Sequence, residues 1–129
     1  MRGLPLLFST MLLLGGCSDS CKNTVLTRST SPGGKWDALM LERSCGATTD
    51  FSTEISVLKA GGAGLGGGNI FVGDNDHGVA RPGRWGGPWA EIKWLSPTRL
   101  LVRYAAGSRV FLQSKAVGDV FVTNQIVGG

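Results

Sequence analysis

The chain has 129 residues, of which 42% are hydrophobic and 17% charged, and its formal net charge is +4. This length accommodates one domain and leaves no room for a second, and the hydrophobic content is too high for a disordered chain. The 21 glycines have no three-residue period, which excludes collagen and indicates many turns. Three cysteines are unusual in a small secreted domain, which normally holds an even number.

Residues 1–16 have the pattern of a cleaved targeting peptide. Arg2 supplies a positive start, and residues 4–14 form an apolar run that is shorter than the ~20 residues of a transmembrane helix. The next segment, Leu14-Gly15-Gly16-Cys17, resembles the lipobox of bacterial lipoproteins. The resemblance implies cleavage before Cys17, diacylglycerol on its thiol, and an acyl chain such as palmitate on the new amino terminus. The alternative is a plain secretory peptide with an accidental cysteine.

The lipobox also predicts where the protein resides. Three acyl chains, each worth about 0.8 kcal/mol per buried CH₂, anchor a protein permanently. Ser18 follows the lipidated cysteine, at the position where enterobacteria use aspartate for inner-membrane retention. We therefore expect a cell-envelope protein, lipid-anchored in the outer membrane and facing the periplasm, although Asp19 favours the inner membrane in other bacteria. The expected divisions are a signal peptide at 1–16, a lipidated tether at 17–23 and a single β domain at 24–129.

The remaining cysteines, Cys21 and Cys45, form an even pair in an oxidising compartment, which predicts a disulfide bond. Closing a loop of about 25 residues would stabilise the fold by about 3–4 kcal/mol. The alternative is two buried free thiols.

Beyond residue 16, apolar and polar residues alternate with period two, and no helical periodicity occurs. Short turns such as Ser31-Pro32-Gly33-Gly34 and Ser96-Pro97-Thr98 favour antiparallel neighbours. We therefore predict an all-β domain, a small antiparallel meander of seven or eight strands that forms a sandwich or barrel. The expected strands span residues 24–28, 36–42, 51–57, 69–73, 89–94, 99–104, 109–113 and 117–122.

Two loops interrupt this pattern: a glycine-rich spacer at 61–68 and a longer polar loop at 73–88. The spacer spells G-x-G-x-x-G at 62–67, but a dinucleotide site needs a helix after this motif and a strand is expected here instead. We therefore expect no nucleotide. Without Arg2 the net charge is +3 and no basic run occurs, so we expect no nucleic acid either.

The polar loop contains Asp74, Asp76 and His77, whose side chains are weak candidates for a calcium or zinc site. An EF-hand would need glutamate at the twelfth position, where this chain has Trp85. Zinc would need three or four ligands, and His77 is the single histidine. An Asx-rich turn without metal is the favoured interpretation.

Catalytic motifs are not evident in the sequence. No G-x-S-x-G segment accompanies His77, and the spacing of Glu42, Glu54 and Glu91 indicates no paired carboxylates. We therefore predict that the protein is not an enzyme and uses no cofactor, with a metal-dependent or hydrolytic enzyme as a remote alternative.

Arginine and tryptophan gather in or beside the polar loop as Arg81, Arg84, Trp85 and Trp89. These residue types on loops are typical of binding hot spots, so the four are candidate partner-binding residues. The favoured interpretation of the two tryptophans is nevertheless packing, with Trp89 at the beginning of a strand and Trp85 filling the end of a sheet.

Four segments in this order resemble a family of small proteobacterial lipoproteins and secreted proteins of unknown function, over roughly residues 21–112. The family commonly has an acidic residue directly before the cysteine that corresponds to Cys45, where this chain has Ser44. It commonly has glycine after the threonine that corresponds to Thr49, where this chain has Asp50. The resemblance implies no activity, substrate or cofactor. The segments are Ser31-Pro32-Gly33-Gly34-Lys35-Trp36, Cys45-Gly46-Ala47-Thr48-Thr49 with Phe51-Ser52-Thr53, Gly68-Asn69-Ile70-Phe71-Val72 with Asp76-His77-Gly78, and Trp94-Leu95-Ser96-Pro97-Thr98-Arg99-Leu100.

These observations predict a membrane-anchored, non-enzymatic binding or accessory module whose partners are the membrane and an envelope protein. The alternative is a periplasmic inhibitor or immunity protein that plugs an enzyme cleft with the 73–88 loop.

Overall fold

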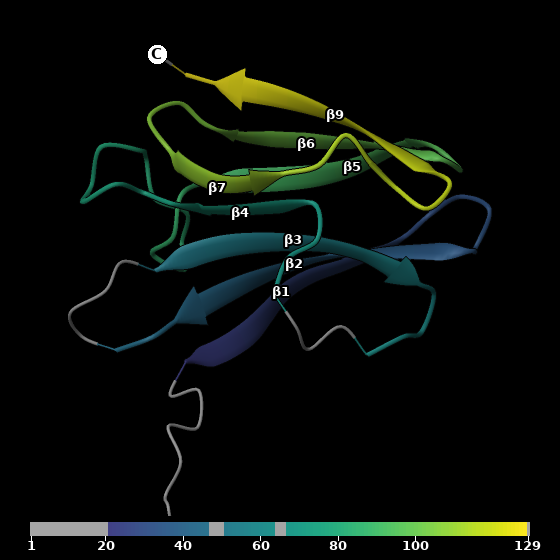
Figure 1. Ribbon diagram of the computed structural model, residues 1–129, viewed down its shortest axis with the longest axis horizontal. Coiled ribbons are helices and arrows are strands. Elements are labelled where there is room, and N and C mark those ends of the chain that lie inside the picture. The colour runs from purple at the N-terminus through teal and green to yellow at the C-terminus, as the bar shows by residue number, and fades with distance from the viewer. Residues whose placement is uncertain (1–20, 47–50, 64–66, 129) are drawn as a thin grey trace, which may run out of the picture.

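The computed structural model describes residues 21–46, 51–63 and 67–128. The predicted signal peptide and the lipobox with Cys17 lie outside these residues. Within them the chain forms nine strands, and no helix there is long and apolar enough to cross a bilayer (Figure 1). The strands are β1 (Lys22–Thr30), β2 (Trp36–Ser44), β3 (Ser52–Lys59), β4 (Phe71–Asp74), β5 (Ala90–Ser96), β6 (Arg99–Ala105), β7 (Arg109–Gln113), β8 (Ala116–Val117) and β9 (Val120–Val127).

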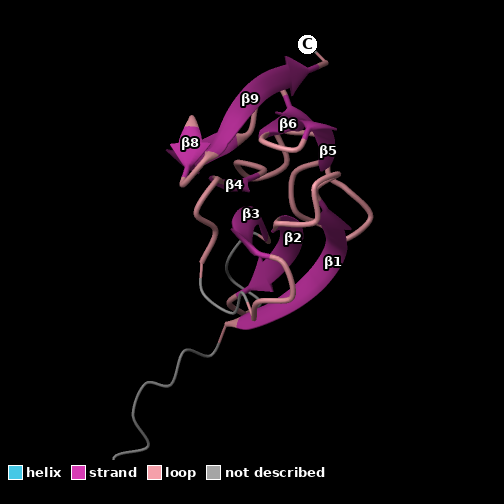
Figure 2. Ribbon diagram, turned by 90° about the vertical axis from the view of Figure 1, so that its right-hand side faces the viewer, coloured by secondary structure: helices cyan, strands magenta, loops and turns pink. Residues whose placement is uncertain are grey.

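The strands form two sheets that pack as a sandwich (Figure 2), which confirms the predicted all-β class. The first sheet has the order β1-β2-β3-β4-β7 and the second the order β5-β6-β9-β8. All pairs are antiparallel except β6 and β9, which run parallel, so the fold is not a simple meander. After β6 the chain crosses to the first sheet, where it forms β7, and then returns to the second sheet as β8. Because of this crossover, β9 lies beside β6 and runs in the same direction.

The strand predicted at 117–122 is in fact two strands. Val117 pairs with Val120 across a tight turn at Gly118 and Asp119, and Gly118 has the left-handed φ of 56° that this turn requires. Because the surrounding residues are apolar, the turn interrupts what reads as one continuous strand.

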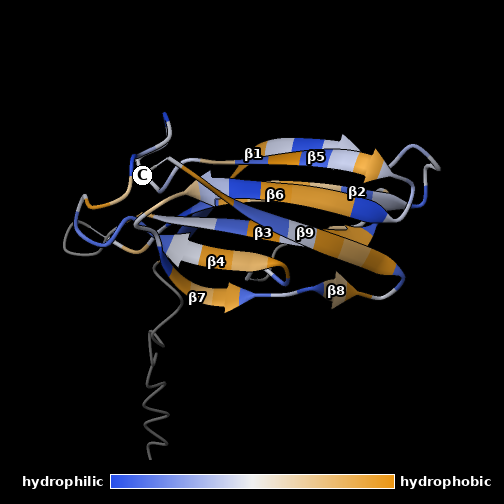
Figure 3. Cartoon of the chain, turned by 90° about the horizontal axis from the view of Figure 1, so that it is seen from above, coloured by the Kyte–Doolittle hydropathy of each residue, from blue (hydrophilic) through white to orange (hydrophobic). Residues whose placement is uncertain are grey.

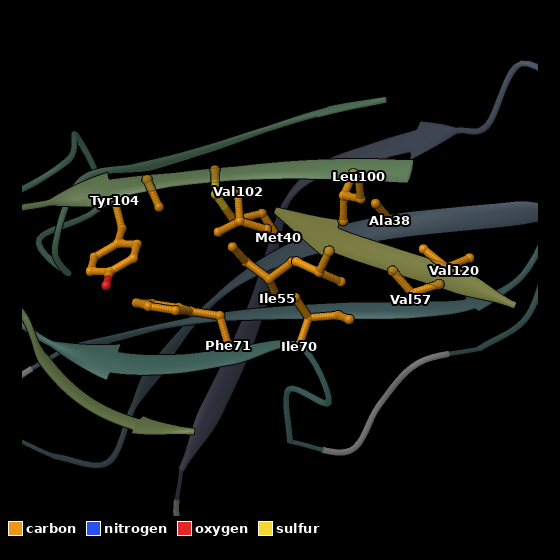
Figure 4. Packing of buried hydrophobic residues seen from close by; sticks show 12 residues of the cluster. Ala38, Met40, Ile55, Val57, Ile70, Phe71, Leu100, Val102, Tyr104 and Val120 are labelled. Carbon is orange, nitrogen blue, oxygen red and sulfur yellow. The ribbon is translucent and has the colours of Figure 1, made fainter. Parts of the chain in front are cut away.

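Alternation along the strands builds the core between the sheets (Figures 3 and 4). The rings of Phe71 and Tyr104 meet across it with centroids 5.0 Å apart, and the Tyr104 hydroxyl accepts a hydrogen bond from Gln113. The labelled side chains in Figure 4 point toward one another from both sheets, and they are Ala38, Met40, Ile55, Val57, Ile70, Phe71, Leu100, Val102, Tyr104 and Val120.

The outer face of the first sheet is also buried at its centre, where Leu39 and Leu41 are each 1% exposed. The chain after β3 folds back toward this face: the Gly61 N–H donates to Asp37 (2.9 Å), and Arg28 donates to the Gly62 carbonyl (3.0 Å). At the other described end of the predicted glycine-rich spacer, the Gly68 N–H donates to Glu54 (3.4 Å), so both described ends are tied to the sheet.

A disulfide joins Cys21, just before β1, to Cys45, just after β2. The neighbouring residues Lys22 and Ser44 pair in the ladder between the two strands. The bond therefore closes the open end of the β1–β2 hairpin, and the predicted pairing is confirmed.

Candidate functional site

The candidate site is centred on Trp89, which lies just before β5. The next residue, Ala90, is buried in the core and pairs with Tyr104, so the alternation of the strand turns the Trp89 ring to the outer face of the second sheet. The guanidinium of Arg81 lies 4.6 Å from the centre of this ring, and that of Arg103 lies 5.8 Å from it. Trp89 is thus in contact with two cations at cation–π distance.

A small hairpin between the two residues brings Arg81 to Trp89. Pro82 and Pro88 form a β-bridge, and the Trp89 N–H donates to the Arg81 carbonyl (2.8 Å). On the other side, the Ala105 N–H donates to the Trp89 carbonyl (2.9 Å), which continues the ladder with β6. Backbone hydrogen bonds therefore hold both residues of the stack in place.

The charges of the stack are unequally compensated. Arg103 forms an ion pair with Glu91, its cross-strand neighbour. Arg81 is exposed and has no carboxylate partner among the described residues. Stacking occupies the flat face of a guanidinium and leaves its N–H edge available, so Arg81 presents fixed donors to an anion.

The same face continues across the sheet. Arg99 pairs with Phe121 of β9, lies 5.9 Å from its ring, and donates to the Thr123 hydroxyl (3.3 Å). Phe121 is 55% exposed. We call this outer surface of the second sheet the cationic face; its described charged residues are four cations and one acid, with Trp89 and Phe121 between them. It comprises Arg81, Trp89, Glu91, Lys93, Arg99, Arg103 and Phe121.

The sequence contains a signal for this face that net charge conceals. Residues 21–80 hold five basic and six acidic side chains, whereas residues 81–129 hold seven basic and only two acidic ones. The second sheet comes entirely from the second part, and Lys93, Arg99 and Arg103 lie on its strands, whereas Arg109 belongs to β7 of the first sheet. Counting charge by segment would have found the cationic face.

A hollow of about 240 Å³ adjoins Arg81. It lies where the polar loop, the turn after β6 and the end of β9 meet, and small side chains form most of its wall. A group held by the Arg81 guanidinium would therefore have space beside it. The lining residues are Val79, Arg81, Ala105, Ala106, Val127 and Gly128.

Arg84 and Trp85 lie elsewhere, so the four candidate partner-binding residues divide into two pairs. The indole N–H of Trp85 donates to the Thr53 hydroxyl (2.8 Å), which in turn donates to the Pro88 carbonyl (2.8 Å). Both residues line a second hollow of about 340 Å³, together with Leu26, Thr27 and Met40. Trp85 is therefore anchored to its own domain and packs against the core cluster.

Asp74, a weak metal candidate, is engaged with protein donors. Its carboxylate accepts from Nε and Nη2 of Arg109 (3.0 and 2.6 Å) and from the Asp76 N–H (3.0 Å), which closes an Asx turn. Burial alone would raise the pKa of Asp74, but Arg109 and the Asp76 amide outweigh it and hold that pKa below its ordinary value. His77 follows with a left-handed φ of 55°, and no cluster of three metal-ligating side chains occurs in the described ranges.

Comparison of the chain with protein-family models, with curated proteins and with solved structures found no match in any of the three.

Proposed function

We propose that this protein is a non-enzymatic binding module of the bacterial cell envelope, and that its cationic face binds an acidic surface of another envelope protein. The observation behind the proposal is Arg81, an exposed guanidinium stacked on Trp89 without a carboxylate partner in the described structure. Arginine and tryptophan dominate binding hot spots because they bury a large area while offering directed donors. Complementary charge raises the rate of association and selects the partner.

The proposal includes the anchor that the lipobox predicts. Lipid on Cys17 would hold the domain at the outer membrane, facing the periplasm, and membership of the small lipoprotein family would accord with this position. The expected tether is short, because the disulfide at Cys21 and the first strand at Lys22 follow closely. Four residues from Ser18 to Cys21 reach about 14 Å when extended, so the domain would stay next to the membrane surface.

Affinity capture tests the binding face. Full-length protein would be used to capture partners from detergent-solubilised envelope, with Arg81→Gln compared against Arg84→Gln as a control of equal charge change three residues away. We expect an acidic protein that is captured by the original chain and by Arg84→Gln, is lost with Arg81→Gln, and is released by added salt. Unchanged capture by Arg81→Gln would contradict the proposal.

The same pair of variants separates the alternative function. The hollow beside Arg84 favours an inhibitor or immunity protein that uses the 73–88 loop, since an enzyme rim could seat there. In that case Arg84→Gln would lose the captured enzyme and Arg81→Gln would retain it.

Fatty-acid labelling tests the anchor. Cells fed a labelled fatty acid should incorporate it into the original chain but not into Cys17→Ala, which should also leave the membrane fraction. A Cys17→Ala protein that remains equally membrane-bound would exclude lipid on this residue.

A further inference from the structure

The edges of the two sheets differ in how they are protected. Edge strands usually carry charged residues, bulges or other irregularities, because a regular open edge can pair with another chain. The edge strands are β1, β5, β7 and the two-residue β8, and the first three each have a charged residue and a shift in register. These features are Arg28 with the shift at Val25/Thr27 in β1, Lys93 with that at Trp94/Ser96 in β5, and Arg109 with that at Val72/Gly73 where β7 meets β4.

Strand β9 lies next to the short β8, which covers only the beginning of it, and β9 lacks such protective features. It contains no charged residue, proline or glycine, and its ladder with β6 runs from Phe121 to Val127 without a shift. On its other side, β8 pairs only with Val120 and Phe121, and the Val122 N–H donates to the Lys115 carbonyl (2.8 Å). Among the described residues, no strand pairs with Thr123–Val127 on that edge.

The direction of the open backbone groups follows from the hydrogen bonds already made. The Phe121 N–H donates to Thr98 and the Val127 carbonyl accepts from Ala106, so the odd-numbered residues of β9 bond toward β6. The N–H and carbonyl groups of Asn124 and Ile126 therefore point to the open edge. Two donors and two acceptors stand there in strand geometry.

The side chains at this edge also lack cover. Ile126 is on the core-facing side of β9 by alternation, yet it is 60% exposed. The side-chain oxygen of Asn124 is buried without a hydrogen-bond partner, although its amide nitrogen donates to Ser114. A strand placed beside β9 would shield Ile126 and satisfy the open backbone groups.

We propose that the occupant is a second copy of this chain, with β9 pairing antiparallel to β9 of the other copy around a two-fold axis at Gln125. In this register Asn124 lies opposite Ile126 of the other copy, and the two such pairs exchange four backbone hydrogen bonds. The paired segment is uncharged, so no like charges face each other across the two β9 strands themselves. Strand β8 of each copy ends the open stretch and fixes the register.

The two-fold axis has a consequence for the cationic face. An antiparallel pair keeps the outer sides of both second sheets on one side, so the cationic faces of the two copies form one surface. Pairing is independent of any ligand on that surface, but an acidic partner with repeated charges would bind the pair with avidity.

Cysteine cross-linking of the full-length protein in its membrane tests the register. Gln125→Cys places two thiols in a non-hydrogen-bonded pair, where Cα atoms are about 4.5 Å apart, and mild oxidation should give a disulfide-linked dimer. The matched control is Thr123→Cys on the same outer side, whose copies would be about 13 Å apart and should not cross-link. Equal cross-linking at both positions, or none at Gln125→Cys, would overturn the proposal.

Sedimentation equilibrium of the purified full chain tests the edge itself. Ile126→Pro removes an N–H that points to the open edge and leaves the β6 ladder intact, so we expect dimer affinity to fall at least tenfold with an unchanged circular dichroism spectrum. The control Val25→Lys changes an exposed apolar residue on the opposite edge and should leave dimerisation unaltered. A chain that stays monomeric up to millimolar concentration would overturn the proposal, as would one that binds an extended segment of another protein at this edge.

Discussion

The outer faces of the two sheets differ in whether their charged side chains have partners within the protein. On the first sheet, Asp37 is bound by Arg28, Thr30 and the Gly61 amide, and Asp74 by Arg109. On the second sheet, Arg81, Lys93 and Arg99 are exposed and have no ion-pair partner among the described residues. The difference teaches that charge on the first face serves the fold, whereas charge on the second is available to a ligand. Changes on the first face should therefore alter stability, and changes on the second should alter binding.

The sharpest test of this comparison uses two leucines. Leu41 lies on the outer side of the first sheet and is 1% exposed. Leu95 lies in β5 of the second sheet and is 49% exposed. Leu41→Ala should lower the free energy of unfolding by about 2–5 kcal/mol, because it leaves a cavity. Leu95→Ala should change it by less than about 0.5 kcal/mol. Urea denaturation of both variants measures the contrast, and similar values would break it.

Reduction of the disulfide should have the next largest effect. Cys21 and Cys45 are 24 residues apart and close the end of the β1–β2 hairpin. Opening this loop should destabilise the protein by about 3 kcal/mol, because the unfolded chain gains conformational freedom. Thermal unfolding with and without reductant gives the value. The cationic face should keep its affinity under reducing conditions below the melting temperature, since the disulfide lies at the ends of β1 and β2 and the face lies on the second sheet.

Acid should act on the first face. Hydrogen bonds from Thr30 and the Gly61 amide, together with Arg28, hold the pKa of Asp37 below its ordinary value of 3.8. A carboxylate with a lowered pKa contributes stability that is fully present above its ordinary pKa. This stability is lost as the pH falls through the folded-state pKa. We expect the free energy of unfolding to decline below about pH 4, and to decline less steeply in Asp37→Asn. Identical pH profiles for the two proteins would contradict this assignment.

The smallest effect on stability should come from the second face. Arg81→Gln removes an exposed charge and a cation–π contact, which together contribute about 0.5–1 kcal/mol or less. Its thermal midpoint should stay within a few degrees of the original, while binding to an acidic partner is lost. A large drop in stability without a change in binding would show that Arg81 stabilises the fold and does not bind the ligand.

Local patterns predicted most of the strands, because alternation and turn residues are local properties. The predicted 109–113 coincides with β7, and 36–42 lies within β2. The parallel pairing of β6 with β9 could not be predicted in this way, since it depends on a crossover that no short segment encodes. Trp89 and Arg81 were recognised as residue types, but Arg103 joins them only through the register of β5 with β6. Besides the uneven charge of the two parts of the chain, the sequence holds a second signal of this site: Arg81-Pro82 and Pro88-Trp89 mirror each other, as the two sides of a small hairpin would.

The place of β9 has a consequence for how the protein is made. This strand comes last in the chain, yet it lies between β6 and β8 and supplies Val120 and Val122 to the core. The second sheet therefore cannot be completed until the chain has been synthesised as far as Val127. Folding should be a late event that involves the entire domain, with a rate limited by contacts between distant segments. A chain that ends before residue 120 should be recognised by the cell as unfolded and degraded.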